Sequence, residues 1–480
     1  MNKKILALSV AAAIGGISTS ASAALTFNAD GVGHILIQPY FTAQEGNSTL
    51  INLVNTDTVR GKAVKVRFRS AGNSDDVLDF QVFLSPGDVW TANVSEGADG
   101  KAVLSTADKT CTVPAIPAGG VSFITNNLPP SATDAEKATW TREGYVEFLN
   151  MGDIVKDADT TTAAYKLYAT TKHVAGVAPC DTAILNDPTK VEPGLSAPTS
   201  GLMGNWTIIN VPSAASWAGE SAALVSAGAP TNVVYFPQDS NQYFPAVSVN
   251  MHTADPLLIK ADKVANFDLP DLSTPYDGDY ANATAQAAAL TTALAVSSVT
   301  NEFLTNAAIA AETDWVFSMP TRRYHVAYDY ATTVAAEKRV FNVAGAAVTT
   351  APVASWFYSS NTEVSGNLIC VKLGGVTNFD QEEGTATAGV VFSPGTIETV
   401  KFCGEGTVVK FNGSNVLGAS VASGSLSTGS TAGWTTINTA NGGFGLPVLG
   451  QSFVQATNSA VAAGVSGNFG AGWAHRVTRP

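Results

Sequence analysis

Short runs of apolar and β-branched residues, separated by Asn, Gly, Asp and Pro, recur over residues 34–94. Within this stretch, residues 64–69 alternate strictly between apolar and cationic side chains. Successive side chains of a β-strand point to opposite faces, so the pattern predicts a strand whose apolar face packs inward. It also predicts that Lys65, Arg67 and Arg69 face water. A series of such runs is typical of an antiparallel β-sandwich.

Strand-like patterns continue along the chain, with one helical interruption. We predict a mainly β protein with multiple antiparallel β-sandwich (Ig-like) modules and a helical, Ala-rich insertion. No fixed-period repeat of the solenoid or propeller kind is present in the sequence. The expected regions are a signal peptide over 1–23, an N-terminal Ig-like β-sandwich module over 24–120, a second β-rich region over 121–266, a proline turn with an Ala-rich helical insertion over 267–313, and a C-terminal β-rich region over 314–480.

Two segments have helix-forming composition. Residues 281–311 are rich in Ala and Leu and are predicted to be helical, although their Thr, Ser and Val content disfavours one unbroken helix. Residues 216–226 are predicted to form a short Ala-rich helix. By contrast, Trp90, Trp206 and Trp315 lie in apolar strand patterns, and we expect all three in the core.

The first residues have the three parts of a secretory signal. Lys3 and Lys4 precede an apolar run over residues 5–17, and Ala21-Ser22-Ala23 has the form of a signal-peptidase site. The apolar run is too short to span a bilayer as a helix. The sequence therefore predicts a chain that is exported through its signal peptide to the cell surface or the extracellular space, and that does not span the membrane.

The charge balance narrows the class of partner. The 480 residues include 26 basic and 39 acidic side chains, a net charge of −13, and only 14% of all residues are charged. Proteins that bind nucleic acid usually carry a basic stripe, so this class is disfavoured. An acidic surface of this kind can use divalent cations as bridges. The length predicts roughly two to four domains.

Four cysteines lie too far apart in sequence for a C-x-x-C metal or redox motif. In an oxidising compartment two disulfides are the simplest interpretation, and three pairings are possible. We favour the sequence-local pairing, Cys111–Cys180 and Cys370–Cys403. Loops of this size contribute about 3–5 kcal/mol each in the chain-entropy model. Four buried free thiols are the alternative, which is expected mainly in reducing compartments.

The nearest approach to a catalytic motif is Gly219-Glu-Ser-Ala-Ala223, one residue away from the G-x-S-x-G nucleophile elbow. That motif requires a strand that ends at the serine, whereas the predicted strand ends near Val211. We therefore expect Ser221 to be an ordinary helical serine. Five histidines are scattered without an i,i+4 pair: His34, His173, His252, His325 and His475. We predict no enzyme activity, no catalytic residues and no certain cofactor.

Acidic pairs in turn-like segments are the candidate metal ligands. Calcium takes six to eight oxygen ligands from carboxylates and loop carbonyls. Asp277 with Asp279 is the first choice for a Ca²⁺ site, and Asp157 with Asp159 is the second. The acidic groups over 75–79 and 380–383 have similar contexts, and none matches the twelve-residue EF-hand loop. Solvated turn carboxylates are the alternative, because turns favour Asp in any case.

A group of motifs resembles a family of secreted Gram-negative cell-surface proteins described as surface-layer (S-layer) proteins. They run along most of the chain after the signal peptide. The motifs are residues 49–55, 66–69, 84–90, 142–147, 268–276, 313–316 and 319–322, together with the Ala-x-Ala signal. The resemblance implies a subunit of a surface coat, and it implies no catalytic residues.

The sequence thus predicts an exported structural cell-surface protein, a self-assembling coat subunit whose main partner is itself in a lateral lattice. An outer-membrane polysaccharide is a further expected partner, which Arg322 and Arg323 or the cations of residues 65–69 could contact. The alternatives are a secreted adhesin or glycan-binding protein and, less favoured, a secreted hydrolase that uses Ser221 or a pair of carboxylates. Propagating assemblies need heterologous contacts, which a sequence pattern does not display.

Overall fold

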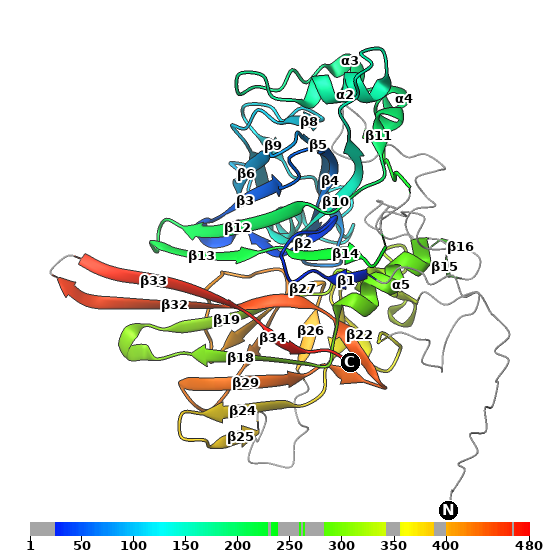
Figure 1. Ribbon diagram of the computed structural model, residues 1–480. Coiled ribbons are helices and arrows are strands. Elements are labelled where there is room, and N and C mark those ends of the chain that lie inside the picture. The colour runs from blue at the N-terminus through cyan, green and yellow to red at the C-terminus, as the bar shows by residue number, and fades with distance from the viewer. Residues whose placement is uncertain are drawn as a thin grey trace, which may run out of the picture.

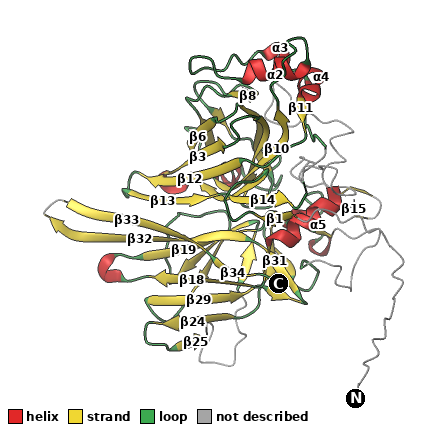
Figure 2. Ribbon diagram, viewed as in Figure 1, coloured by secondary structure: helices red, strands yellow, loops and turns green. Residues whose placement is uncertain are grey.

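The computed structural model describes residues 25–228, 232–238, 259–260, 263–264, 283–341, 356–387, 400–462 and 465–480. The predicted signal peptide over 1–23 lies outside these residues, as do Asp277, Asp279 and His252. Within the described part the protein is mainly β, with several antiparallel sheets (Figure 1, Figure 2). The mainly β fold class predicted from the sequence is confirmed.

Two sheets make up the first half of the chain, and all their strand pairs are antiparallel. Sheet A has the spatial order β1 (Leu25–Phe27), β14 (Ala222–Ser226), β2 (Ile35–Thr42), β10 (Glu143–Ile154), β4 (Gly61–Ser70), β5 (Asp76–Leu84) and β8 (Cys111–Val113), with β11 (Leu195–Ser196) beside β10. Sheet B has the order β13 (Ala215–Glu220), β12 (Leu202–Asn210), β3 (Asn47–Asn55), β6 (Val89–Glu96), β7 (Ala102–Ser105) and β9 (Val121–Ser122). Both sheets therefore draw strands from either side of residue 120.

Sheets A and B face each other across one apolar core. Val64, Val66 and Phe68 of β4 are fully buried in it, as the alternation of residues 64–69 predicted. Phe68 packs edge-on against Phe41, with ring centroids 5.3 Å apart, and Trp90 from sheet B closes the core from the other side. Aromatic contacts of this geometry add to the hydrophobic gain from burial.

The prediction that the β4 cations face water is wrong. Lys65, Arg67 and Arg69 are all completely buried. Their face of sheet A is covered by an apolar cluster that includes helices α2 (Ala163–Thr171), α3 (Thr182–Leu185) and α4 (Pro188–Val191), by a second cluster that includes α5 (Ala283–Leu294), and by the other half of the chain. Alternation alone identifies the two faces of a strand, and it cannot show that later segments cover the polar one.

The second half contains two larger sheets and several small ones (Figure 1). Sheet G has the order β25 (Thr385–Thr387), β24 (Val376–Asp380), β29 (Ala432–Asn438), β18 (Ser298–Leu304) and β34 (Arg476–Thr478). Sheet H has the order β28 (Ser423–Leu426), β27 (Gly406–Phe411), β19 (Glu312–Ser318), β32 (Leu449–Ala462) and β33 (Val465–Ala474). The small sheets are β22 (Thr362–Ser365), β23 (Leu368–Lys372) and β26 (Lys401–Cys403); β17 (Ala295–Val296), β31 (Phe444–Pro447) and β30 (Ala440–Asn441); β20 (Val326–Tyr328) and β21 (Arg339–Phe341); and β15 (Ile259–Lys260) and β16 (Lys263–Val264).

Strands of sheets G and H and of the β22–β23–β26 sheet enclose the core of the second half. Trp315 and Phe317 of β19 are fully buried there, and the ring of Phe317 stacks on Phe402 at a centroid distance of 4.2 Å. Trp90, Trp206 and Trp315 are at most 1% exposed. Their predicted core positions are confirmed.

The helices are short: α1 (Asp134–Trp140), α2 (Ala163–Thr171), α3 (Thr182–Leu185), α4 (Pro188–Val191) and α5 (Ala283–Leu294). The prediction of a helix over residues 281–311 is wrong beyond Leu294, where β17 and β18 follow. The predicted helix over residues 216–226 is also wrong, because that segment forms β13 and β14. Alternating burial of Ala215 and Trp217 against exposed neighbours outweighs the helix propensity of alanine.

The two halves meet through a separate apolar cluster. Tyr40 of β2 and Trp206 and Trp217 of sheet B pack against Val316 and Phe453 of sheet H. The indole Nε1 of Trp217 also donates a hydrogen bond of 2.9 Å to the carbonyl oxygen of Val454. This contact holds the edge of sheet B against strand β32.

Two disulfides, Cys111–Cys180 and Cys370–Cys403, are present, in the sequence-local pairing. Cys111 lies on edge strand β8 of sheet A, and Cys180 lies between α2 and α3. The first disulfide therefore joins the group of helices α2, α3 and α4 to the sheet. Cys370 and Cys403 face each other on neighbouring strands β23 and β26.

We expect the first disulfide to contribute more stability than the second. The two close sequence separations of 69 and 33 residues. In the chain-entropy model this difference is worth about 0.7 kcal/mol within a total of about 2–5 kcal/mol per disulfide. The paired variants C111A/C180A and C370A/C403A, compared by urea unfolding, measure both losses. A larger loss for the second pair would contradict the entropic explanation.

Candidate functional site

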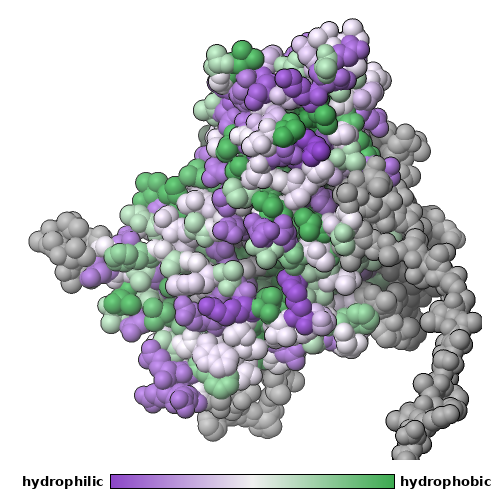
Figure 3. Space-filling model, viewed as in Figure 1, coloured by the Kyte–Doolittle hydropathy of each residue, from purple (hydrophilic) through white to green (hydrophobic). Residues whose placement is uncertain are grey.

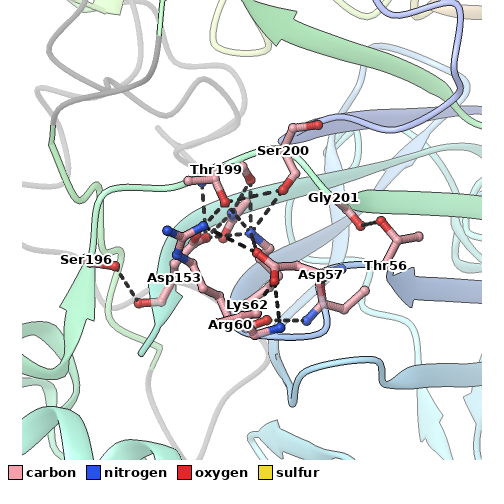
Figure 4. Close-up of polar contacts among 12 residues, drawn as sticks. Thr56, Asp57, Arg60, Lys62, Asp153, Ser196, Thr199, Ser200 and Gly201 are labelled. Atoms are coloured by element: carbon pink, nitrogen blue, oxygen red, sulfur yellow. Dashed lines mark hydrogen bonds and ion pairs between the residues drawn. The ribbon is translucent and has the colours of Figure 1, made fainter. Parts of the chain in front are cut away.

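Lys62 of β4 is a fully buried lysine held at one end of the two sheets (Figure 4). Its ammonium group donates hydrogen bonds to Asp153 Oδ1 at 2.9 Å, to Thr199 Oγ1 at 2.7 Å and to the Ser200 carbonyl at 3.1 Å. Asp57 Oδ2 lies 3.8 Å away. Because these oxygens surround the ammonium, it is a structural cation that joins β4, β10 and the segment before β12.

The three other β4 cations form a buried ionic row across sheet A. Lys65 Nζ lies 3.1 Å from Asp79 Oδ1, Arg67 Nη2 lies 3.5 Å from Asp79 Oδ2, and Arg69 Nε lies 3.2 Å from Glu147 Oε2. Burial lowers the pKa of Lys65 to about 8, against the opposing effect of Asp79. In the acidic group over residues 75–79, Asp76 and Asp79 therefore neutralise β4 cations, and the whole group is buried instead of forming a solvated turn.

A second polar cluster joins the halves around Glu405, which is fully buried. Arg322 Nη2 lies 3.1 Å from Glu405 Oε1, and the hydroxyl of Tyr145 on β10 donates to Glu405 Oε2 at 3.2 Å. Ser74 also donates to this carboxylate. Burial raises the pKa of Glu405 to about 7, although Arg322 acts in the opposite direction. Arg322 is thus an interior residue, and it is not available for the polysaccharide contact that the sequence suggested for it.

The candidate calcium ligands fall into two cases. Asp157 and Asp159 are exposed and shape their own turn: Asp157 accepts from the Asp159 amide at 3.0 Å, and Asp159 accepts from the Thr161 amide at 2.9 Å. Asp277 and Asp279 lie outside the described residues. Within the described ranges, no group of three His, Cys, Asp or Glu side chains is placed to hold a metal ion.

A cavity of about 470 Å³ opens between the two halves. Ser221, which lies between β13 and β14, lines it together with His475 from the end of β33. The Ser221 hydroxyl is buried and has no hydrogen-bond partner in the described part of the protein. The expectation that Ser221 lies in a helix is wrong.

His475 does not provide a base for Ser221. Its Nδ1 accepts from the Asn301 side-chain amide at 3.1 Å, and its Nε2 lies 3.0 Å from the Val316 carbonyl oxygen, to which it donates. Burial lowers the pKa of His475 to about 3, so the ring is neutral. A nucleophile and its base must share a hydrogen bond, and both ring nitrogens are already occupied. The geometry therefore gives no support to a hydrolase that uses Ser221 with His475 as its base.

The cavity also contains residues that the sequence did not single out. Gln451 of β32 and Arg479 near the chain end line it, beside glycines of β13 and β33. The signal that could have pointed to them is weak: glycine recurs at positions 467, 470 and 472 of an edge strand, where it permits close backbone approach. Ser221 and Gln451, which both line the cavity, are more than 200 positions apart in sequence.

No protein-family model, no curated protein and no solved structure matches this chain. Among the helices that the structure describes, none is long and apolar enough to cross a membrane. The function is therefore inferred from the sequence and the geometry of this chain.

We expect Lys62→Met to lower the free energy of unfolding by about 3–5 kcal/mol, because it leaves Asp153 buried without its counter-ion. Urea unfolding followed by tryptophan fluorescence measures the loss. Lys190→Met is the matched control, since Lys190 is half-exposed and lies 3.3 Å from an exposed Asp187. Surface pairs contribute about 0–1 kcal/mol. Equal, small losses in both variants would refute a structural role for Lys62.

We expect Glu405→Gln to remove a pH dependence of stability. The folded-state pKa of about 7 lies above the ordinary value of 4.5, so the folded state binds this proton more tightly. The stabilisation is complete below pH 4.5 and is lost as the pH rises to 7, by about 1.4 kcal/mol per pKa unit. The measurement is the difference in unfolding free energy between wild type and variant across that range.

The buried histidines have lowered pKa values and act in the opposite direction, but they are common to both proteins and cancel in the difference. Glu382→Gln, in an exposed turn, is the control and should leave the pH profile unchanged. A Glu405→Gln profile parallel to that of the wild type would contradict the assignment.

Proposed function

We propose that this protein is an exported structural protein of the cell surface, which assembles laterally with copies of itself. The observation that supports this proposal is a projecting arm, defined as the parts of the β32–β33 hairpin over residues 456–462 and 465–469. Figure 1 shows this hairpin reaching beyond the body of the protein. The predicted signal peptide and the two disulfides fit an oxidising compartment outside the cytoplasm.

The arm continues past the sheet from which it starts. The ladder between β32 and β19 ends at the pair Glu312–Gln455, whereas β32 runs on to Ala462 and pairs there with β33. Strand edges that extend beyond their sheet offer backbone hydrogen-bonding groups to another chain. The arm can therefore add a strand to a neighbouring subunit.

Aromatic side chains accompany the exposed edge. Phe469 and Trp473 lie four residues apart on β33, and therefore on the same face of the strand. They are 63% and 38% exposed. Elsewhere on the viewed face, hydrophobic and hydrophilic residues are interspersed (Figure 3). A projecting strand with an exposed aromatic side chain such as Phe469, if it fits a surface on the next copy, makes a heterologous contact, which propagates instead of closing.

The sequence resemblance supports the finer version of this proposal, in which the molecule is an S-layer subunit built from Ig-like sandwich modules. In that version Asp277 and Asp279 bind Ca²⁺, and the subunit lies on an outer-membrane polysaccharide. The buried cations of β4 are not available to bind an anionic polysaccharide, so a calcium bridge is the more suitable link between two acidic partners.

A secreted adhesin or glycan-binding protein is the second candidate, and one observation favours it. Trp434 of β29 is 41% exposed and stacks on Phe379 of β24 with centroids 4.1 Å apart. Exposed aromatic rings can stack on sugars, because one face is apolar and the rim tolerates water. Glycan-array binding by a monodisperse monomer, lost in Trp434→Ala, would favour this candidate over self-assembly.

We expect arm removal to abolish assembly while the body stays folded. Residues 458–467 are replaced by Asn-Gly, a two-residue turn that joins the cross-strand pair Thr457–Asn468. Light scattering and negative-stain microscopy compare the mature wild type and the variant, with calcium and with a chelator. The wild type should form ordered sheets or tubes, and the variant should remain monomeric with an unchanged circular dichroism spectrum.

Phe469→Ser should weaken assembly without removing the strand edge. Val174→Ser is the matched control, because Val174 is 67% exposed on the loop after α2. Wild type that stays monomeric under both conditions would overturn self-assembly, and assembly that survives arm replacement would overturn the role of the arm. If the chelator alone dissolves the wild-type assemblies, the contact between subunits depends on a calcium site.

A further inference from the structure

Sheet B has one face turned inward and one turned outward. Along β3, β6, β12 and β13, buried residues alternate with more exposed ones, and the buried set packs against sheets A and H. Because successive side chains of a strand point to opposite faces, the more exposed set shares one face. We call this set the outer face, and it consists of every second residue over 48–54, 89–95, 103–105, 203–209 and 216–218.

Every member of the outer face is uncharged. The central row crosses five strands, and its members are Ala218, Thr207, Leu50, Asn93 and Ser105. A second row is apolar and joins Met203, Val54 and Val89. Leu50, in the middle of the central row, is 36% exposed, and Val89 is 42% exposed. Apolar side chains of the outer face are therefore open to solvent.

Acidic side chains stand at the rim of the outer face. Glu220 ends β13 beside Asn205, and Glu96 ends β6. The Asp108 carboxylate accepts a hydrogen bond of 3.3 Å from the Thr91 hydroxyl at the edge of β6. An uncharged centre inside a polar rim is the usual composition of a protein–protein interface.

The net charge of the chain opposes close contact between copies. It is −13 over 480 residues, so two copies repel each other where acidic groups face acidic groups. Strands of sheet G carry the exposed charged residues Glu302 and Arg476. A second copy can approach the centre of the outer face of sheet B without burying a charge, which removes the main electrostatic cost of association.

The outer face is large enough for a reversible contact. With strands about 4.8 Å apart and a rise of about 3.4 Å per residue, it covers about 400–500 Å² on each copy. Two copies would bury roughly 800–1,000 Å², which is the low end of protein–protein interfaces and typical of weak pairs. The area therefore fits a dimer in equilibrium with its monomer.

Hydroxyl and carboxamide groups make the outer face complementary to itself. A carboxamide both donates and accepts hydrogen bonds, so Asn52, Asn93 and Asn205 can pair with the same groups on a second copy. The aliphatic members add apolar contact. No member of the outer face is aromatic, so it offers no ring for stacking on a sugar. This chemistry fits a protein surface of the same composition.

We infer that the outer face of sheet B binds the outer face of a second copy of this chain. The contact is isologous: a two-fold axis passes near Leu50, and each copy presents the same residues. The two sheets stack about 10 Å apart, as in a β-sandwich built from two molecules. This contact closes on itself, whereas the contact proposed for the arm propagates, and neither depends on the other.

Sedimentation velocity over a concentration series, on the mature full chain in the presence of a chelator, tests this dimer. A monomer–dimer equilibrium with a Kd of about 1–100 μM is expected. Because no ion pair or cation bridge contributes, added salt should not weaken it. The arm-replacement variant should dimerise in the same way, so failure of assembly through the arm is distinguished from failure of this contact. Wild type that stays monomeric over the whole series would overturn the inference.

Variants at the centre of the outer face locate the contact. Leu50→Glu places like charges on either side of the two-fold axis and should raise the Kd about tenfold or more. Leu50→Lys should do the same alone. An equimolar mixture of the two variants should restore the dimer, which also shows that both are folded.

Val174→Glu is the matched control and should dimerise as the wild type does, because Val174 is 67% exposed on the loop after α2. A dimer that survives Leu50→Glu unchanged, or a mixture that stays monomeric, would refute a contact through this face.

Discussion

The burial of three cations on one face of β4 is the constraint on which the arrangement of this protein depends. Lys65, Arg67 and Arg69 are inside because sheet A is covered on both faces. Isolated charges cannot be buried at acceptable cost, so each needs a carboxylate, and Asp79 and Glu147 supply them from the neighbouring strands. A register slip of one residue along β4 would place these cations in the apolar core and leave the acids without partners.

The same requirement acts where the two halves meet. Glu405 from the second half lies against Tyr145 and Ser74 of the first, and Glu143 of β10 accepts hydrogen bonds from Tyr40 and from the Ser420 amide at 2.8 and 2.9 Å. The apolar cluster around Phe453 supplies hydrophobic stabilisation that is not directional. The hydrogen bonds and ion pairs of the buried carboxylates are directional. Together with the apolar cluster, they favour one docked arrangement of the two halves over arrangements in which one half is shifted along the other.

The sequence predicted what depends on local patterns. The alternation of residues 64–69 identified the core-facing side of β4, and the three tryptophans were correctly expected in the core. The sequence-based prediction was wrong where distant segments determine whether a strand face is buried. The β4 cations are covered by helices α2 to α4 and by Glu405, which come from 100 to more than 300 residues later in the chain. The prediction of a helix over residues 216–226 was wrong because it gave more weight to the alanine composition than to the strand pattern around Trp217. The cavity was not predictable, because Ser221 and Gln451 meet only through docking of the halves.

The cavity and the arm lie on the same two strands, β32 and β33. Gln451 lies at the base of β32, and Gly472 faces it from β33, whereas the arm begins beyond Gln455, where the ladder with β19 ends. The pair Ala456–Phe469 is therefore the boundary: before it the hairpin is held by β19 and β13, and from it onward the two strands are paired with each other. Changes confined beyond that pair leave the Gln451 amide and its glycine neighbours in place. Loss of the arm and disruption of the contact between the halves are thus separable in one molecule, although the same hairpin takes part in both.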